Sequence, residues 1–192
     1  MLLDQGNVLL AVGRAAIAQA LNLDFQYPVD ESASWLQDWG ASFVTLTQHH
    51  ELRGCIGSLE AYRPLVADVR SNAVSAALHD PRFLPLSADE FETIAIEVSI
   101  LSPTQRIAAL NEADAIRQMR PGIDGIVLEY GRYRSTFLPQ VWDELEQPQQ
   151  FLAMLKRKAG LPVDFWAADL KLARYTVSKW RETDGMEDYR HG

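Results

Sequence analysis

The chain has 192 residues, of which 47% are hydrophobic and 23% are charged, a composition typical of globular proteins, and its length fits one ordinary domain or two small lobes that share a core. The net charge of −8 argues against broad nucleic-acid binding, which draws its affinity from phosphate neutralisation. A single cysteine excludes an internal disulfide, and no stretch approaches the roughly 18 apolar residues that span a membrane. We therefore expect a cytoplasmic protein.

The spacing of apolar residues divides the first half of the chain into helix, hairpin, helix and strand. Asp80 and the proline after it are expected to end the second helix. Residues 94–101 alternate between apolar and other side chains, which predicts a strand with one buried face. The predicted elements are a helix over 4–22, a loop over 22–34, strands over 41–47 and 51–58 joined around 48–50, a helix over 63–78, a short helix opened by a capping box at 87–90, and the strand over 94–101.

The second half repeats this order. Its predicted elements are a helix from Asn111 to Met119, strands over 125–130 and 133–138 that turn at 131–132, a helix over 148–159 and a strand over 172–180. Residues 43–46 parallel 126–129, and residues 96–99 parallel 175–178. The sequence thus predicts an α+β fold of pseudo-duplicated hairpin-helix-strand units, with a mixed or antiparallel sheet flanked by helices.

Residues 52–57 hold the cysteine, next to an arginine and between two glycines. In a strand, alternation would place Arg53, Cys55 and Gly57 on one face. The guanidinium, about 7 Å away along a strand, would favour a thiolate at Cys55. The alternative is that Cys55 is a small buried apolar residue and that the glycines only allow two elements to pack closely.

A nucleophilic cysteine needs a base within hydrogen-bond reach. His49 and His50 lie in the hairpin turn, too far along the strand for direct contact. His79 ends a helix and could fold back, although a residue meeting the helix dipole is its ordinary interpretation. Glu97 is the best carboxylate candidate if its face lines a cleft with Cys55, and the default is a face in contact with solvent.

Residues 80–83 predict a rigid turn with a salt bridge, or an anion site in which Arg82 and Arg53 form a guanidinium pair. Ser99 shares a strand face with Glu97. No second cysteine exists, so no metal site is expected. The candidate catalytic residues are Cys55, Arg53 and Glu97, and the candidate ligand-binding residues are Gly54, Gly57, Asp80, Arg82 and Ser99.

Six segments follow one another in a recognisable order: residues 52–57, 80–83, 96–99, 125, 137–142 and 158–160. Together they resemble the AMMECR domain family, which in bacteria and archaea includes the AmmeMemoRadiSam system protein A. The likeness covers about residues 8–180. It implies a single AMMECR-type domain over residues 1–192, with large and small lobes packed intimately and the cysteine motif near the cleft between them.

The resemblance implies an association with a Memo-like protein and a radical S-adenosylmethionine enzyme, and no particular reaction. We prefer the hypothesis of an accessory component that binds a partner or small ligand in a cleft shaped by the motif of Cys55. The alternative is a cysteine-dependent enzyme for a small anionic substrate, with Arg53 and Arg82 holding the anion and Glu97 or His79 as acid or base. No cofactor is expected, because the chain lacks the cysteines that hold an iron–sulfur cluster.

Overall fold

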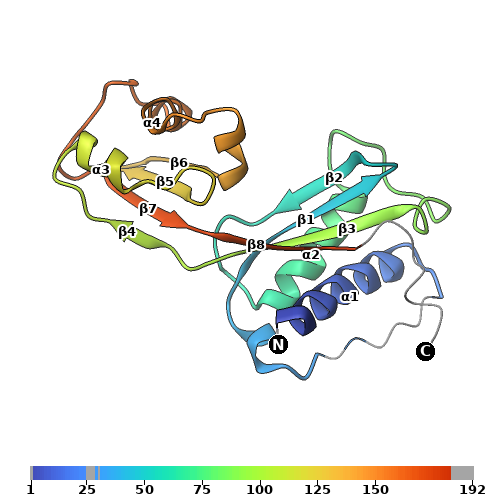
Figure 1. The fold of residues 1–192 in the computed structure, drawn as a ribbon. Coiled ribbons are helices and arrows are strands. Elements are labelled where there is room, and N and C mark those ends of the chain that lie inside the picture. Colours follow the sequence, from blue (N-terminus) through green and yellow to red (C-terminus); the bar gives the residue numbers. More distant parts are fainter. Residues whose placement is uncertain (1, 25–28, 30, 183–192) are drawn as a thin grey trace. The chain divides into compact units, whose positions relative to one another are not determined.

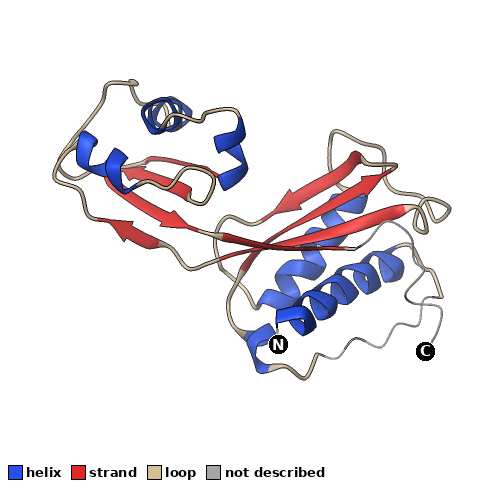
Figure 2. Ribbon diagram, in the orientation of Figure 1, coloured by secondary structure: helices blue, strands red, loops and turns tan. Residues whose placement is uncertain are grey.

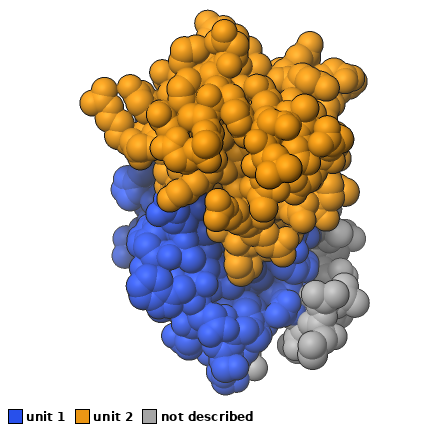
Figure 3. Space-filling view, turned by 90° about the vertical axis from the view of Figure 1, so that its left-hand side faces the viewer, with its two compact units in different colours: residues 1–101, 178–192 blue, residues 102–177 orange. Residues whose placement is uncertain are grey.

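The computed structural model describes residues 2–24, 29 and 31–182, and it contains two compact units. The first comprises residues 1–101 and 178–192, and the second comprises residues 102–177 (Figure 3). Each unit has a four-stranded antiparallel sheet with helices on one face (Figures 1 and 2). The predicted α+β class is confirmed. Intimate packing of the two lobes stays a prediction.

In the first unit, two helices cover one face of a sheet with strand order β2-β1-β3-β8. Side chains at alternate positions of β1 and β3 form the core beneath them, among them Val44, Leu46, Ile96 and Val98, all fully buried. The elements are α1 (Leu2–Ala20), η1 (Ser34–Gln37), β1 (Ala41–Gln48), β2 (Glu51–Gly57), α2 (Leu65–Leu78), β3 (Ile94–Leu101) and β8 (Val177–Arg181).

In the second unit, the strand order is β4-β7-β5-β6. Trp142 is buried and stacks on Phe151 of α4 at 3.8 Å between ring centroids, so it belongs to the core. The elements are β4 (Gln105–Ile107), α3 (Glu112–Gln118), β5 (Gly125–Tyr130), β6 (Tyr133–Phe137), η2 (Pro139–Asp143), α4 (Pro148–Lys158) and β7 (Lys171–Tyr175).

The two units share one plan, as the duplicated sequence pattern predicts. Hairpin β1–β2, helix α2 and strand β3 correspond to hairpin β5–β6, helix α4 and strand β7. The correspondence extends to the sheets, because order β2-β1-β3-β8 matches order β6-β5-β7-β4. The duplication is therefore confirmed both in chain order and in sheet order.

The single strand predicted over residues 172–180 is wrong. It is two strands in two different sheets, β7 and β8, separated at Thr176. The backbone of Thr176 is paired with Ser102: its N–H donates to the Ser102 hydroxyl, and its carbonyl accepts from the Ser102 N–H, both at 2.9 Å. The predicted parallel between 96–99 and 175–178 fails as well, since the strand equivalent to β3 is β7.

The predicted capping box forms only in part, and no helix follows it. The N–H of Ser87 donates to the carboxylate of Glu90, which is one of the two bonds of a capping box. The second bond is missing, because the Ser87 hydroxyl also donates to this carboxylate and the Glu90 N–H donates to the Ser87 carbonyl. Residues 88–93 are consecutive turns that lead directly into β3 at Ile94. The predicted short helix is wrong because so few residues precede the strand that a helical nucleus does not form.

Two connections of the first unit are the hairpin turn between β1 and β2 and the loop that follows α1. His49 and His50, with φ angles of 52° and 65°, make the predicted turn between β1 and β2. Positive φ at both central residues is the geometry that matches the twist of a two-residue hairpin. The predicted loop over 22–34 falls partly outside the described residues. No helix in the described part of the chain is both long and apolar enough to cross a membrane.

Candidate functional site

The predicted site residues gather around β2 and on the face of the first sheet that α1 and α2 do not cover. Thr45 of β1 lies opposite Cys55 of β2 and opposite Glu97 of β3, which places the three in one row across the sheet. Lys179 of β8 extends the row, with its Nζ 3.9 Å from Glu97 Oε1. We call this side the outer face of the first sheet; it comprises Phe43, Thr45, Cys55, Gly57, Glu97, Ser99 and Lys179.

Cys55 is half-buried and is held through both its side chain and its backbone. The Thr45 hydroxyl donates to Cys55 Sγ at 3.3 Å. The Cys55 N–H donates to Asp80 Oδ2 at 2.9 Å, and the Cys55 carbonyl accepts from Arg82 Nη2 at 3.2 Å. Since β2 is an edge strand, Asp80 and Arg82 occupy positions where a further strand would pair.

The turn at residues 80–83 contains the predicted salt bridge. Arg82 donates to Asp80 from its backbone N–H and from its guanidinium, with Nη2 2.7 Å from Oδ2. This side-chain bond, together with the N–H of Cys55, holds the pKa of the Asp80 carboxyl well below its usual range, although burial opposes the shift. Asp80 in turn raises the pKa of Arg82. The pair is therefore charged throughout the physiological range.

Arg53 binds a carboxylate of its own chain. Leu46 lies opposite Gly54 and Thr47 lies opposite Leu52, so Arg53 is the extra residue of a β-bulge and strict alternation does not reach it. Its guanidinium makes a two-point contact with Glu90, at 2.9 and 3.0 Å. The Arg53 bond, followed by that from the Ser87 N–H, lowers the pKa of Glu90 to about 2.

Phe83 brings the two arginines near each other. The Arg53 and Arg82 Cζ atoms lie 5.9 and 5.5 Å from the centre of the Phe83 ring, within the range of a cation–π contact. Each arginine keeps its own carboxylate partner. Arg53 Nη1 is buried and has no hydrogen-bond acceptor in the described part of the chain.

The two glycines of the motif have different surroundings. A Cβ on Gly54 would lie 2.2 Å from the Ala76 carbonyl oxygen, so Gly54 allows β2 to approach α2 on the helical side of the sheet. A Cβ on Gly57 would meet the Phe43 ring at 2.2 Å. Close packing thus accounts for both glycines.

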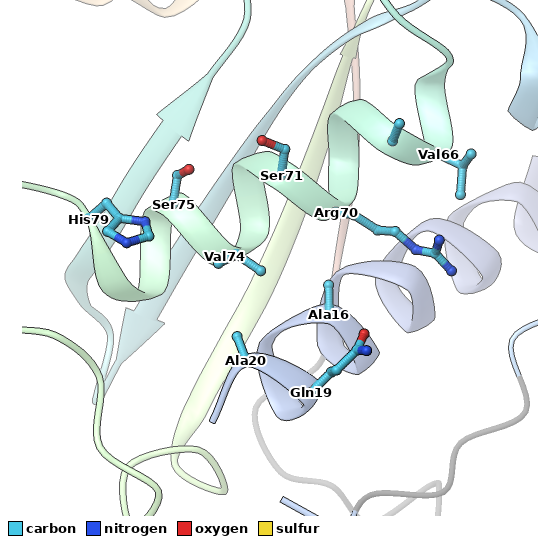
Figure 4. A pocket seen from close by; sticks show the side chains of 10 residues that line it. Ala16, Gln19, Ala20, Val66, Arg70, Ser71, Val74, Ser75 and His79 are labelled. Carbon is cyan, nitrogen blue, oxygen red and sulfur yellow. The ribbon is translucent and has the colours of Figure 1, made fainter. Parts of the chain in front are cut away.

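The remaining candidates are divided between the two sides of the sheet. Ser99 lies opposite Phe43 on the outer face and is 7% exposed, whereas Glu97 is half-buried. His79 is exposed at the C-terminal end of α2. It borders a groove of about 570 Å³ between α1 and α2, lined mainly by small side chains (Figure 4).

Three residues of the site were missed by sequence reasoning: Thr45, Glu90 and Lys179. Thr45 stands in a strand that the sequence predicted, and its position across from Cys55 depends on the hairpin register. Glu90 was assigned to a capping box, and no pattern indicated that it also binds Arg53. Lys179 lay in the wrongly continuous final strand, so its sheet could not be assigned.

The side-chain contact of the thiol is a hydroxyl. Among the described residues, no histidine or carboxylate is hydrogen-bonded to Cys55 Sγ, and the hydroxyl that does reach it is a poor base. In that same part of the chain, no group of three or more histidine, cysteine or acidic side chains is placed to hold a metal ion.

Comparison with known proteins gives one consistent family. The family model AMMECR1 matches residues 10–180. The chain is 35% identical over 187 residues to a protein of Methanothermobacter thermautotrophicus, covering 93% of this chain and 95% of that protein. It is 40% identical over 140 residues to Protein MJ0810 of Methanocaldococcus jannaschii, covering 70% and 68%.

A solved structure agrees with this similarity. The crystal structure of the uncharacterized protein PH0010 from Pyrococcus horikoshii matches with a TM-score of 0.77 and 32% sequence identity. The match covers 94% of this chain and 93% of that one. The likeness therefore extends over both units.

Proposed function

Because the chain belongs to the AMMECR1 family, we propose that it is an accessory binding protein whose outer face of the first sheet receives a partner or a small ligand. The observation that carries this proposal is the environment of Cys55. The thiol is partly exposed on a face without helices, and its side-chain contact is the Thr45 hydroxyl rather than a base. Such a site can recognise and hold a molecule without a general base.

The state of the arginines supports binding over anion activation. Arg53 and Arg82 each make a two-point ion pair, with Glu90 and Asp80 respectively. Two-point guanidinium–carboxylate contacts are among the stronger polar interactions in proteins. A substrate anion would have to displace a carboxylate that is already aligned, so these arginines serve better to shape β2 than to bind a substrate.

The second candidate is a cysteine-dependent enzyme for a small anionic substrate. Its support is the row in which Cys55, Thr45 and Glu97 follow one another across three strands. Neighbouring strands are about 4.8 Å apart, so the backbones of Cys55 and Glu97 are separated by about 10 Å. Glu97 would act on the thiol only through an intervening group, which makes this candidate the weaker one.

For the partner, we propose a Memo-like protein or a radical S-adenosylmethionine enzyme, on the basis of the family resemblance. The test is a binding titration of each purified partner against the full chain carrying Lys179→Glu, with Arg70→Glu as the matched control. Both side chains are about half exposed, at 49% and 51%, but Lys179 is on the outer face and Arg70 lines the groove between α1 and α2.

We expect Lys179→Glu to weaken the complex about tenfold, because it places a second carboxylate beside Glu97 in the interface. Arg70→Glu should leave the affinity unchanged. Equal losses in the two variants, or no complex of the unmodified chain with either partner at about 10 μM, where a micromolar Kd would be visible, would contradict the proposal.

Cys55→Ser separates the two candidate functions. Serine keeps a hydroxyl that can pair with Thr45, so the binding proposal expects the affinity for the partner to be retained. If the complex instead forms only while the thiol is present, and Cys55 is found covalently modified in it, the enzyme candidate replaces the binding proposal.

A further inference from the structure

On the second unit's sheet, the face opposite the helices has a different chemical character from the outer face of the first sheet. Ile126 and Leu128 of β5 are fully buried in the core beneath the helices, so the residues between them point to the opposite side. Val127 lies opposite Ala173, which is also the partner of Arg106 on β4. Glu129 lies opposite Lys171 on β7 and Arg134 on β6. We call Arg106, Val127, Glu129, Arg134, Lys171 and Ala173 the basic face.

Cations outnumber acidic groups on the basic face. Arg106 and Lys171 are exposed, and neither has an ion pair within the described ranges of the chain. Arg134 is paired with Glu129, Nε to Oε1, at 2.9 Å. The face therefore offers positive charge on β4 and β7 that no carboxylate of the described chain neutralises.

The charge is also unevenly divided between the units. Residues 102–177 contain 10 of the 18 Lys and Arg residues but only 9 of the 26 Asp and Glu residues. An acidic chain thus carries its surplus of negative charge outside the second unit. Charges separated by more than about 10 Å interact weakly in physiological salt. The basic face can therefore attract an anion although the net charge of the chain is −8.

The side chains between the cations of the basic face are small and apolar, which argues against a nucleic acid as the anionic partner. Ala173 and Val127, which is 8% exposed, lie in one row across the sheet between Arg106 of β4 and Thr136 of β6. Tyr175, the aromatic residue next on this face, is 3% exposed, with its ring over Gly125 and its hydroxyl bonded to Thr136. It offers no ring face on which a base could stack, and such stacking is the usual basis of single-strand nucleic-acid binding.

From these observations we propose that the basic face is a second interaction surface, which binds an extended acidic segment of a partner polypeptide. Arg106 and Lys171 receive its carboxylates, and the half-buried Ala173 between them receives a small apolar side chain. This surface goes beyond the proposed function, because it lies on another sheet and shares no residue with the outer face that contains Cys55.

The test uses the full chain and a fluorescein-labelled peptide of alternating glutamate and valine, and binding is followed by fluorescence anisotropy at about 0.15 M salt, where the Debye length is about 8 Å. The test variant is the double substitution Arg106→Ser and Lys171→Ser. The matched control is Arg117→Ser and Arg157→Ser, which removes the same charge from exposed positions on α3 and α4. Thermal unfolding of both variants checks that the fold is kept.

We expect the test variant to bind the peptide at least about tenfold more weakly, since each lost charge-assisted contact is worth severalfold in affinity. The control should bind within about twofold of the unmodified chain, because screening leaves only the local charges to act. The proposal is overturned if the glutamate peptide does not bind, if the two double variants lose affinity equally, or if an RNA oligonucleotide binds more tightly through Arg106 and Lys171.

Discussion

The carboxylate of Asp80 connects the cysteine motif at 52–57 with the turn at 80–83, which are separate in the sequence. It accepts the N–H of Cys55, 25 residues earlier in the chain, and it also binds Arg82 two residues later. The local part of this arrangement, a turn with a salt bridge, could be predicted from the spacing of opposite charges around a proline. The contact with Cys55 could not, because it depends on how the segment after α2 returns along the edge of β2.

Asp80→Asn is expected to make stability less dependent on acid pH. Because Arg82 holds the pKa of folded Asp80 below its unfolded value, the unfolded state binds the proton more readily, and the charged pair stabilises the fold above that value. This contribution is lost as the pH falls below about 4, where the unfolded carboxyl protonates. Urea unfolding should therefore show the original chain about 1–3 kcal/mol more stable than the variant at pH 7, with the gap narrowing steadily toward pH 2. A gap that stays constant with pH would exclude this role.

At the scale of elements, Gly54 determines how closely strand β2 approaches helix α2. We expect Gly54→Ala to destabilise the chain by about 1–3 kcal/mol, the usual cost of overpacking, because the new methyl group would meet the backbone oxygen of Ala76. Gly13→Ala in α1 is the control, since its Cβ would make ordinary contacts of 3.8 Å or more. Thermal or urea unfolding should show the control to be neutral or more stable, because alanine favours a helix interior. Equal losses in both variants would argue against the strand–helix contact.

The elements that could be predicted from the sequence have a long apolar pattern and pack against a single core along their whole length. Helices α1 and α2 and strand β3 each present one continuous face to one core, so their periodicity is unbroken. Residues 171–181 fail this condition because the extended backbone passes from one sheet to the other at Thr176 without a change in period. Strand β4, with three residues, is too short to show any period at all. In the same way, alternation along β2 could not predict the bulge at Arg53, which is a property of the strand pair.

At the scale of the whole molecule, the sheet of each unit has an edge strand that lies outside the hairpin-helix-strand repeat. In the second sheet this strand is β4, which precedes the repeat in the chain. In the first sheet it is β8, which follows the second unit. Trp180 of β8 lies against Gly6 of α1, where no Cβ could fit. The first unit is therefore built from two separate segments of chain, and its integrity depends on residues near 180.

The substitution Glu182→Ala tests whether the first unit depends on residues near 180. Its carboxylate accepts from Arg14 of α1 and from the N–H of Ile96, and its own N–H donates to the Ile96 carbonyl at 2.9 Å. Arg14 is 5% exposed, so Glu182→Ala would leave a buried guanidinium without its carboxylate, at a cost of about 3–5 kcal/mol. Hydrogen exchange followed by mass spectrometry should show faster exchange in α1 and β3, while β5, β6 and β7 keep their protection. Glu129→Ala, which removes the partly exposed partner of Arg134, should cost less than about 1 kcal/mol. Faster exchange in both units of the Glu182 variant would mean that the two sheets unfold as one cooperative body.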